Sequence, residues 1–116
     1  MARKVLVIED NGALRFALQV MLENEPGVQR VATAPSGEAA LRLAPDLDPD
    51  LVVADHGLPG ISGADLAREL RVSCPDAQIV SFSGSDTPAP WADYRIVKGT
   101  ATALDELRAA VTRRPA

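Results

Sequence analysis

Carboxylates stand where two apolar, strand-like runs of this sequence end. The run Leu51–Ala54 stops at Asp55, and the first apolar run of the chain stops at Glu9 and Asp10. Two or three carboxylates in one partly desolvated pocket repel one another, which raises their pKa values unless a cation compensates. Oxygen ligands of this kind suit Mg²⁺, which binds through one or two carboxylates plus a phosphate oxygen. The acids therefore predict a Mg²⁺ site, whereas zinc would need histidine or cysteine ligands.

A carboxylate can also act as a nucleophile towards phosphorus and become an acyl phosphate. The protein then mainly needs to position the reactants and to supply positive charge around the transferred oxygens. Lys98, which follows the last apolar run, would supply part of this charge. Ser83, at the end of another run, could donate its hydroxyl to a phosphate oxygen and so sense the group.

The elements that must bring these residues together are strands and helices in alternation. Short, continuous apolar runs are typical of strands buried on both faces, and the segments between them carry apolar residues at helical spacing. We expect strands at residues 5–8, 28–34, 51–54, 79–82 and 95–97. We expect helices after residues 12, 36 and 62 and from about residue 102, with the second helix ending between Pro45 and Pro49.

This alternation predicts right-handed βαβ units, and therefore a three-layer α/β domain with a five-stranded parallel sheet. In the strand order 2-1-3-4-5 the strands with polar ends are neighbours, and sites form outside the carboxyl ends of such strands. Residues 84–93 contain two prolines and no apolar period, so the fourth helix is predicted to be reduced or missing. Trp91 and Tyr94 are expected to fill the space of that helix or to form a contact surface.

Bulk composition narrows the class of protein. The 116 residues correspond to a single domain, residues 1–116, and 47% hydrophobic with 24% charged residues is ordinary for a globular domain. The net charge of −4 argues against direct nucleic-acid binding, and the single Cys74 excludes an internal disulfide. The first apolar run is too short for a membrane span or a signal-peptide core, so we expect a cytoplasmic protein.

Four motifs in order, each ending a predicted strand, resemble the receiver domain of a two-component response regulator over nearly the whole chain. They are "VLVIEDN", "LVVADHGLPGISG", "IVSFSG" and "RIVKG". The resemblance implies a CheY-like, flavodoxin-like fold. It also implies that Asp55 accepts a phosphoryl group from a sensor histidine kinase or a phosphotransfer protein.

The resemblance assigns a role to each polar strand end. Glu9, Asp10, Asp55 and the backbone carbonyl of Gly57 would hold Mg²⁺. Ser83 and Lys98 would contact the phosphate.

The region between the hydroxyl residue and the lysine departs from the family pattern. Gly99 follows Lys98 where the family usually has proline, and the interval from Ser83 to Lys98 is shorter than usual. The family's aromatic switch position holds Arg95, with Tyr94 one step earlier. Phosphorylation would change a protein-interaction surface here, but relay of the phosphate, docking to another protein and pairing with a second copy all stay open.

Other interpretations compete with the phosphoacceptor. Glu9 and Asp10 could merely cap the first helix. His56 follows Asp55, where strand alternation points it to the other face, so it is left out of the site. The chain could also be a degenerate receiver that binds proteins without phosphorylation, or a small flavin or nucleotide carrier. The carrier is disfavoured because Glu9 and Asp10 would repel a phosphate in the loop after the first strand.

Overall fold

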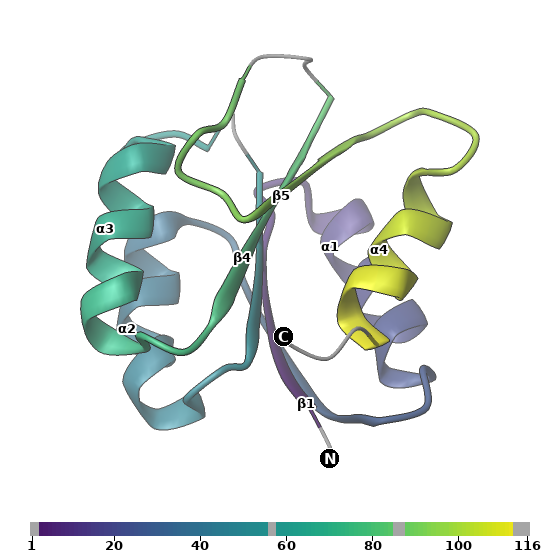
Figure 1. Ribbon diagram of the computed structural model, residues 1–116, viewed down its shortest axis with the longest axis horizontal. Coiled ribbons are helices and arrows are strands. Elements are labelled where there is room, and N and C mark those ends of the chain that lie inside the picture. Colours follow the sequence, from purple (N-terminus) through teal and green to yellow (C-terminus); the bar gives the residue numbers. More distant parts are fainter. Residues whose placement is uncertain (1–2, 56–57, 85–87, 113–116) are drawn as a thin grey trace.

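Five strands form one parallel sheet in the computed structural model, which describes residues 3–55, 58–84 and 88–112 (Figure 1). The strands are β1 (Arg3–Ile8), β2 (Val28–Ala34), β3 (Leu51–Ala54), β4 (Gln78–Ser83) and β5 (Tyr94–Val97). Their order is β2-β1-β3-β4-β5, and every neighbouring pair is parallel. The predicted sheet and strand order are thus confirmed, and the carboxyl ends of β1, β3, β4 and β5 share one edge.

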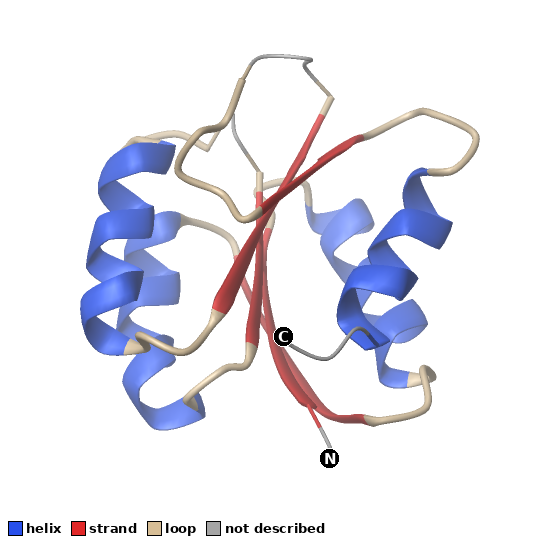
Figure 2. Cartoon of the chain, viewed as in Figure 1, coloured by secondary structure: helices blue, strands red, loops and turns tan. Residues whose placement is uncertain are grey.

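Helices cover both faces of the sheet, which gives the predicted three layers. Helices α1 (Gly12–Glu23) and α4 (Ala103–Thr112) lie on one face, and α2 (Gly37–Leu47) and α3 (Gly63–Ser73) on the other (Figure 2). Three helices begin at a polar cap. Asn11 Oδ1 accepts from the amide of Leu14 at 2.9 Å, Ser36 Oγ from Ala39 and Ser62 Oγ from Asp65, both at 3.1 Å. Such caps satisfy amides that the helix leaves unpaired. In the described part of the chain, no helix is long and apolar enough to cross a membrane.

Helix α2 continues past Pro45 and ends at Leu47, inside the range that the sequence predicts. Proline cannot donate a backbone hydrogen bond, but in the last turn this costs only one bond. The helix stops at Asp48, which has a left-handed backbone and donates its amide to the carbonyl of Ala44 at 2.8 Å.

The core consists of two aliphatic clusters, one on each face of the sheet. Residues of β1 contribute alternately to the two clusters, because successive side chains of a strand point to opposite faces. Val5 and Val7 pack with residues of α1 and α4, while Leu6 and Ile8 pack with residues of α2 and α3. All four side chains are buried. Burial on both faces explains why β1 reads as an unbroken apolar run.

No helix joins β4 to β5 within residues 84 and 88–93, the part of this connection that the structure describes. The chain instead returns along the α3 side of the sheet (Figure 1). Asp93 closes this return by a pair of hydrogen bonds with Ile79, one from its amide and one to its Oδ2, both 2.8 Å. The prediction that the fourth helix is reduced or missing is therefore confirmed for these residues.

Trp91 attaches this connection to α3. Its indole packs against the cluster on the α2 and α3 face, and its carbonyl accepts a hydrogen bond from Arg71 Nη2 at 3.0 Å. The ring lies so close to the start of α3 that a Cβ on Gly63 would be 2.6 Å from Cζ2 of Trp91. Trp91 thus takes part of the place of the missing helix. Tyr94 does not join it but packs against the cluster on the opposite face.

We expect Gly63→Ala to destabilise the protein by about 1–3 kcal/mol, because the new methyl group overlaps the Trp91 ring. In a Trp91→Ala background the same change should be neutral or slightly stabilising, since alanine favours a helix over glycine. Urea unfolding of the two single variants and the double variant measures this coupling. If Gly63→Ala lowered the free energy of unfolding equally with and without the Trp91 ring, the ring would not be the reason for glycine at this position.

Candidate functional site

Three carboxylates meet at the edge formed by the strand ends. Glu9 and Asp10 follow β1, and Asp55 follows β3, where its amide donates to the carbonyl of Ile8 at 3.2 Å. One oxygen of each carboxylate lies within 4.8 Å of the others. Glu9 is buried, Asp55 is half-buried and Asp10 is exposed, so the cluster opens to solvent on the Asp10 side. A set of three hard oxygen donors with open positions fits Mg²⁺.

Lys98 links this cluster to the far edge of the sheet. It follows β5, and its amide donates to the carbonyl of Ser83 at 2.7 Å. The side chain reaches across β4, where Nζ lies 2.5 Å from Glu9 Oε1 and 2.9 Å from Asp55 Oδ2. Its charge also lies over the ring of Phe82, 5.6 Å from the centroid. The pairing of one ammonium with two carboxylates is the electrostatic centre of the site.

Burial and pairing act in opposite directions on the pKa values of this ion pair. Burial raises the pKa of Glu9 above its ordinary value of 4.5, and the hydrogen bonds from Lys98 and from the amide of Asn11 offset this only in part. Burial lowers the pKa of Lys98, but its bonds to Glu9 and Asp55 together raise that pKa above 10.5. Lys98 therefore stays charged at neutral pH. Because Glu9 remains undercompensated beside it, the site has a deficit of positive charge that a divalent cation would fill.

Ser83 lies beside the acids at the end of the neighbouring strand. Ser81 pairs with Ala54 and Ser83 with Val97, so Ser83 ends the strand that lies between β3, which Asp55 follows, and β5, which Lys98 follows. It is buried, with 5% of its surface exposed. The structure thus brings Glu9, Asp10, Asp55 and Lys98 together, with Ser83 on the strand between them. His56 and Gly57, including the predicted carbonyl ligand, lie outside the described residues.

The idea that Glu9 and Asp10 merely cap the first helix is wrong. The cap of α1 is Asn11, and no acid lies in the first turn. Glu9 instead accepts a hydrogen bond from the amide of Asn11 on its Oε2, at 3.0 Å. The cap therefore holds the Glu9 carboxylate in place rather than being formed by it.

Two residues near the site were missed by the sequence interpretation. Arg15 of α1 donates from Nη1 to the carbonyl of Glu9 at 2.8 Å. Glu38 of α2 faces the loop after Asp55: a Cβ on Gly60, whose φ is +87°, would lie 2.7 Å from its Oε2. The sequence signal for Arg15 was a cation in the first turns of a helix, where the exposed amides disfavour positive charge. For Glu38, only the contact with Gly60 shows that it lies beside this loop.

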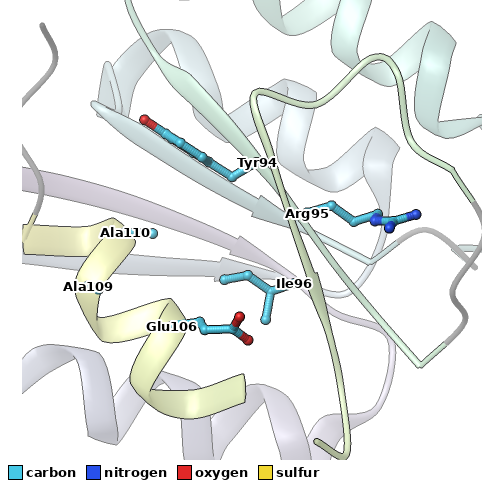
Figure 3. A pocket seen from close by; sticks show the side chains of 6 residues that line it. All are labelled: Tyr94, Arg95, Ile96, Glu106, Ala109 and Ala110. Atoms are coloured by element: carbon cyan, nitrogen blue, oxygen red, sulfur yellow. The ribbon is translucent and has the colours of Figure 1, made fainter. Parts of the chain in front are cut away.

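A cavity of about 250 Å³ lies away from these acids, between β5 and α4. Its lining residues are Tyr94, Arg95, Ile96, Glu106, Ala109 and Ala110 (Figure 3). Tyr94 and Arg95 point to opposite sides of the strand, as alternation requires. None of the acids of the site lines this cavity, so it is not the place where the predicted chemistry would occur.

We compare the free energy of unfolding of Glu9→Gln with that of the parent protein, in the presence of a chelator. We expect the difference to shift in favour of Glu9→Gln as the pH rises from about 4.5 to neutral. The raised pKa means that folded Glu9 holds its proton more strongly than unfolded Glu9. Its ionisation therefore removes stability as the pH rises through the folded-state pKa, and glutamine cannot ionise.

Urea unfolding at several pH values measures this difference. Glu69→Gln, at an exposed position of α3, is the matched control and should show no such trend. A stability difference between Glu9→Gln and the parent that does not change with pH would contradict the raised pKa.

Comparison with known proteins gives a consistent family. The family model of the response regulator receiver domain matches residues 5–105. The response regulator GacA of Pseudomonas syringae is 40% identical over 80 residues, which are 69% of this chain and 37% of that protein. The nitrate/nitrite response regulator NarL of Escherichia coli is 34% identical over 82 residues, 71% of this chain and 38% of that protein. The chain therefore spans little more than a third of the length of these relatives.

Solved structures agree with the sequence relatives. The response regulator TrrA of Thermotoga maritima, solved in complex with Mg²⁺-BeF, has a TM-score of 0.78 and 32% identity, covering 94% of this chain and 96% of that one. The chemotaxis response regulator CheY4 of Vibrio cholerae has a TM-score of 0.79 and covers 93% and 98%. At 23% identity the second likeness shows the fold alone.

Proposed function

Because the chain belongs to the family of response regulator receiver domains, we propose that Asp55 accepts a phosphoryl group from a sensor histidine kinase or a phosphotransfer protein. One observation carries this proposal most directly. Lys98 Nζ, reaching in from β5, lies 2.9 Å from the Asp55 carboxylate within a cluster of acids. A carboxylate beside a fixed cation and a potential metal site has the surroundings that phosphoryl transfer requires.

In the proposed step an oxygen of the Asp55 carboxylate attacks the phosphorus of a phosphohistidine. A P–O bond forms while the P–N bond breaks, and the electron pair of the P–N bond goes to the imidazole nitrogen. Asp55 becomes an acyl phosphate. Lys98 would balance charge on the transferred oxygens, and Ser83, one strand away, would donate its hydroxyl to one of them.

Glu9, Asp10 and Asp55 would hold Mg²⁺, with the carbonyl of Gly57 as the further ligand that the family resemblance implies. When bound, the ion would neutralise and orient the phosphoryl oxygens. Glu9 is buried, and hydrogen bonds to both of its carboxylate oxygens would keep it in a fixed position in the site. The exposed Asp10 would face the incoming ion.

We expect the protein to gain one phosphoryl group when it is incubated with acetyl phosphate and Mg²⁺. Acetyl phosphate is a small donor that needs no docking surface, so the reaction tests the site itself. Intact-mass measurement detects the product. Asp55→Asn should gain nothing, because the amide is not a nucleophile, and omission of Mg²⁺ should slow the reaction strongly.

A parent protein that stays unmodified would contradict the proposal, provided a known receiver reacts in the same mixture. If Mg²⁺ still bound, the alternative would gain support: a degenerate receiver that binds other proteins without phosphorylation. No yellow colour in the purified protein would exclude the flavin carrier.

The output would pass through the connection between β4 and β5. Ser83 ends β4, and the same chain segment leads to Trp91, which is held on Gly63 and Arg71 of α3. If the Ser83 hydroxyl moved towards a phosphoryl group on Asp55, the end of β4 would shift. This shift would strain the contacts of Trp91 with α3. The changing surface would therefore include the connection and α3. Pairing with a second copy, a cytoplasmic location and the absence of direct nucleic-acid contact remain predictions.

We expect phosphorylation to change the fluorescence of Trp91, the only tryptophan in the chain. The emission reports on the packing of the indole against the start of α3. Ser83→Ala should still be phosphorylated but should lose most of the change, because the hydroxyl that couples β4 to the phosphoryl group is gone. An equal change in Ser83→Ala would show that the coupling does not use Ser83.

A further inference from the structure

Arg15 occupies a place where its charge needs an explanation. It lies near the start of α1, where the helix amides already carry partial positive charge, and the first turn holds no acid that would pair with it. Within the described residues no carboxylate pairs with it either. Its half-buried side chain turns back towards the acidic cluster, and Nη1 donates to the carbonyl of Glu9 at 2.8 Å.

With this contact, every polar group of Glu9 takes part in a hydrogen bond. The amide of Glu9 donates to the carbonyl of Ala34 at 3.0 Å, and its carboxylate accepts from Lys98 and from the amide of Asn11. The remaining polar group of Glu9 is its carbonyl, which Arg15 holds. That carbonyl belongs to the peptide that leads directly into Asp10, the exposed acid of the cluster. Arg15 therefore orients the peptide from which the Asp10 side chain extends.

The charge balance gives Arg15 a second effect. Glu9, Asp10 and Asp55 carry three negative charges, and Lys98 and Arg15 carry two positive ones, which leaves one negative charge. A bound Mg²⁺ would turn this into one positive charge. Conversion of Asp55 to an acyl phosphate would replace the one negative charge of its carboxylate by about two, which would make the site neutral. Without Arg15 the metal-bound site would be neutral and the phosphorylated site negative. The Arg15 charge thus opposes the cation and favours the phosphoryl group.

We propose that Arg15 is a positioning residue that weakens Mg²⁺ binding and promotes phosphoryl transfer to Asp55. The two effects have opposite signs, which distinguishes this role from general support of the fold, because a damaged site would lose both metal and reactivity. The second effect rests on the proposed function. The first depends only on the acidic cluster.

The test compares Arg15→Gln with Arg15→Lys. Glutamine removes the charge but keeps an amide that can donate a hydrogen bond, while lysine keeps both charge and donor. Arg42→Gln, at an exposed position of α2, makes the same change in net charge away from the site and is the matched control. Calorimetric titration with Mg²⁺ gives the dissociation constants, and intact mass over time gives the rate of phosphorylation by acetyl phosphate at saturating Mg²⁺.

We expect Arg15→Gln to bind Mg²⁺ roughly 3- to 10-fold more tightly and to be phosphorylated roughly 3- to 10-fold more slowly, as the loss of one nearby, partly screened charge predicts. Arg15→Lys should stay within about twofold of the parent in both measurements, and Arg42→Gln should match the parent.

Unchanged or weaker Mg²⁺ binding by Arg15→Gln would overturn the inference, whether or not the parent protein reacts with acetyl phosphate. Tighter binding without slower transfer, in a parent that does react, would overturn it as well. A parent that binds Mg²⁺ but is never phosphorylated would instead refute the proposed function. The titrations would then still decide whether Arg15 opposes the cation.

Discussion

The organisation of this domain depends on the pairing of one ammonium with two carboxylates across three strands. Lys98 Nζ lies 2.5 Å from Glu9 Oε1 and 2.9 Å from Asp55 Oδ2, so a residue after β5 is tied to the ends of β1 and β3. Removing Glu9 from water is unfavourable, as its raised pKa shows, and the lysine compensates only in part. The residual deficit of positive charge would favour binding of a cation among the three carboxylates. The aliphatic sheet beneath holds these charges at fixed positions despite their repulsion.

The connection from β4 to β5 shows how a receiver can cover this part of the sheet without a helix in residues 88–93. A helix would have covered the sheet beside α3 with a row of side chains. Here Trp91 packs on Gly63, Arg71 holds its carbonyl, and Asp93 forms a pair of hydrogen bonds with Ile79. A few specific contacts therefore replace a continuous packed surface. Such an attachment can rearrange at lower cost than a packed helix, because fewer buried contacts must separate.

The site also shows why charges beyond the ligands matter. Arg15 donates a hydrogen bond to the carbonyl of Glu9 and adds positive charge beside the acids, although it is not one of the three residues that could hold the metal. If the proposed function holds, the site must hold a cation and then a phosphoryl anion, and it cannot be optimal for both. Its surrounding charges set the compromise between the two.

Sequence patterns were sufficient to predict the strand order, the layers and the three acids that cluster at the sheet edge. This was possible because β3 and residues 5–8 of β1 are buried on both faces and so must be continuously apolar, which makes the polar residue after each run conspicuous. The loss of the fourth helix was also readable, since Pro88 and Pro90 interrupt any helical period there. Other features could not be predicted from these patterns. Trp91 and Tyr94 lie on opposite faces, and Gly63 must lack a side chain beside Trp91. Arg15 contacts Glu9, and Glu38 contacts the loop at Gly60. All of these features depend on contacts between segments far apart or on the path of a side chain. Periodicity and residue type carry no information on such contacts, because they follow from how the layers close around one another.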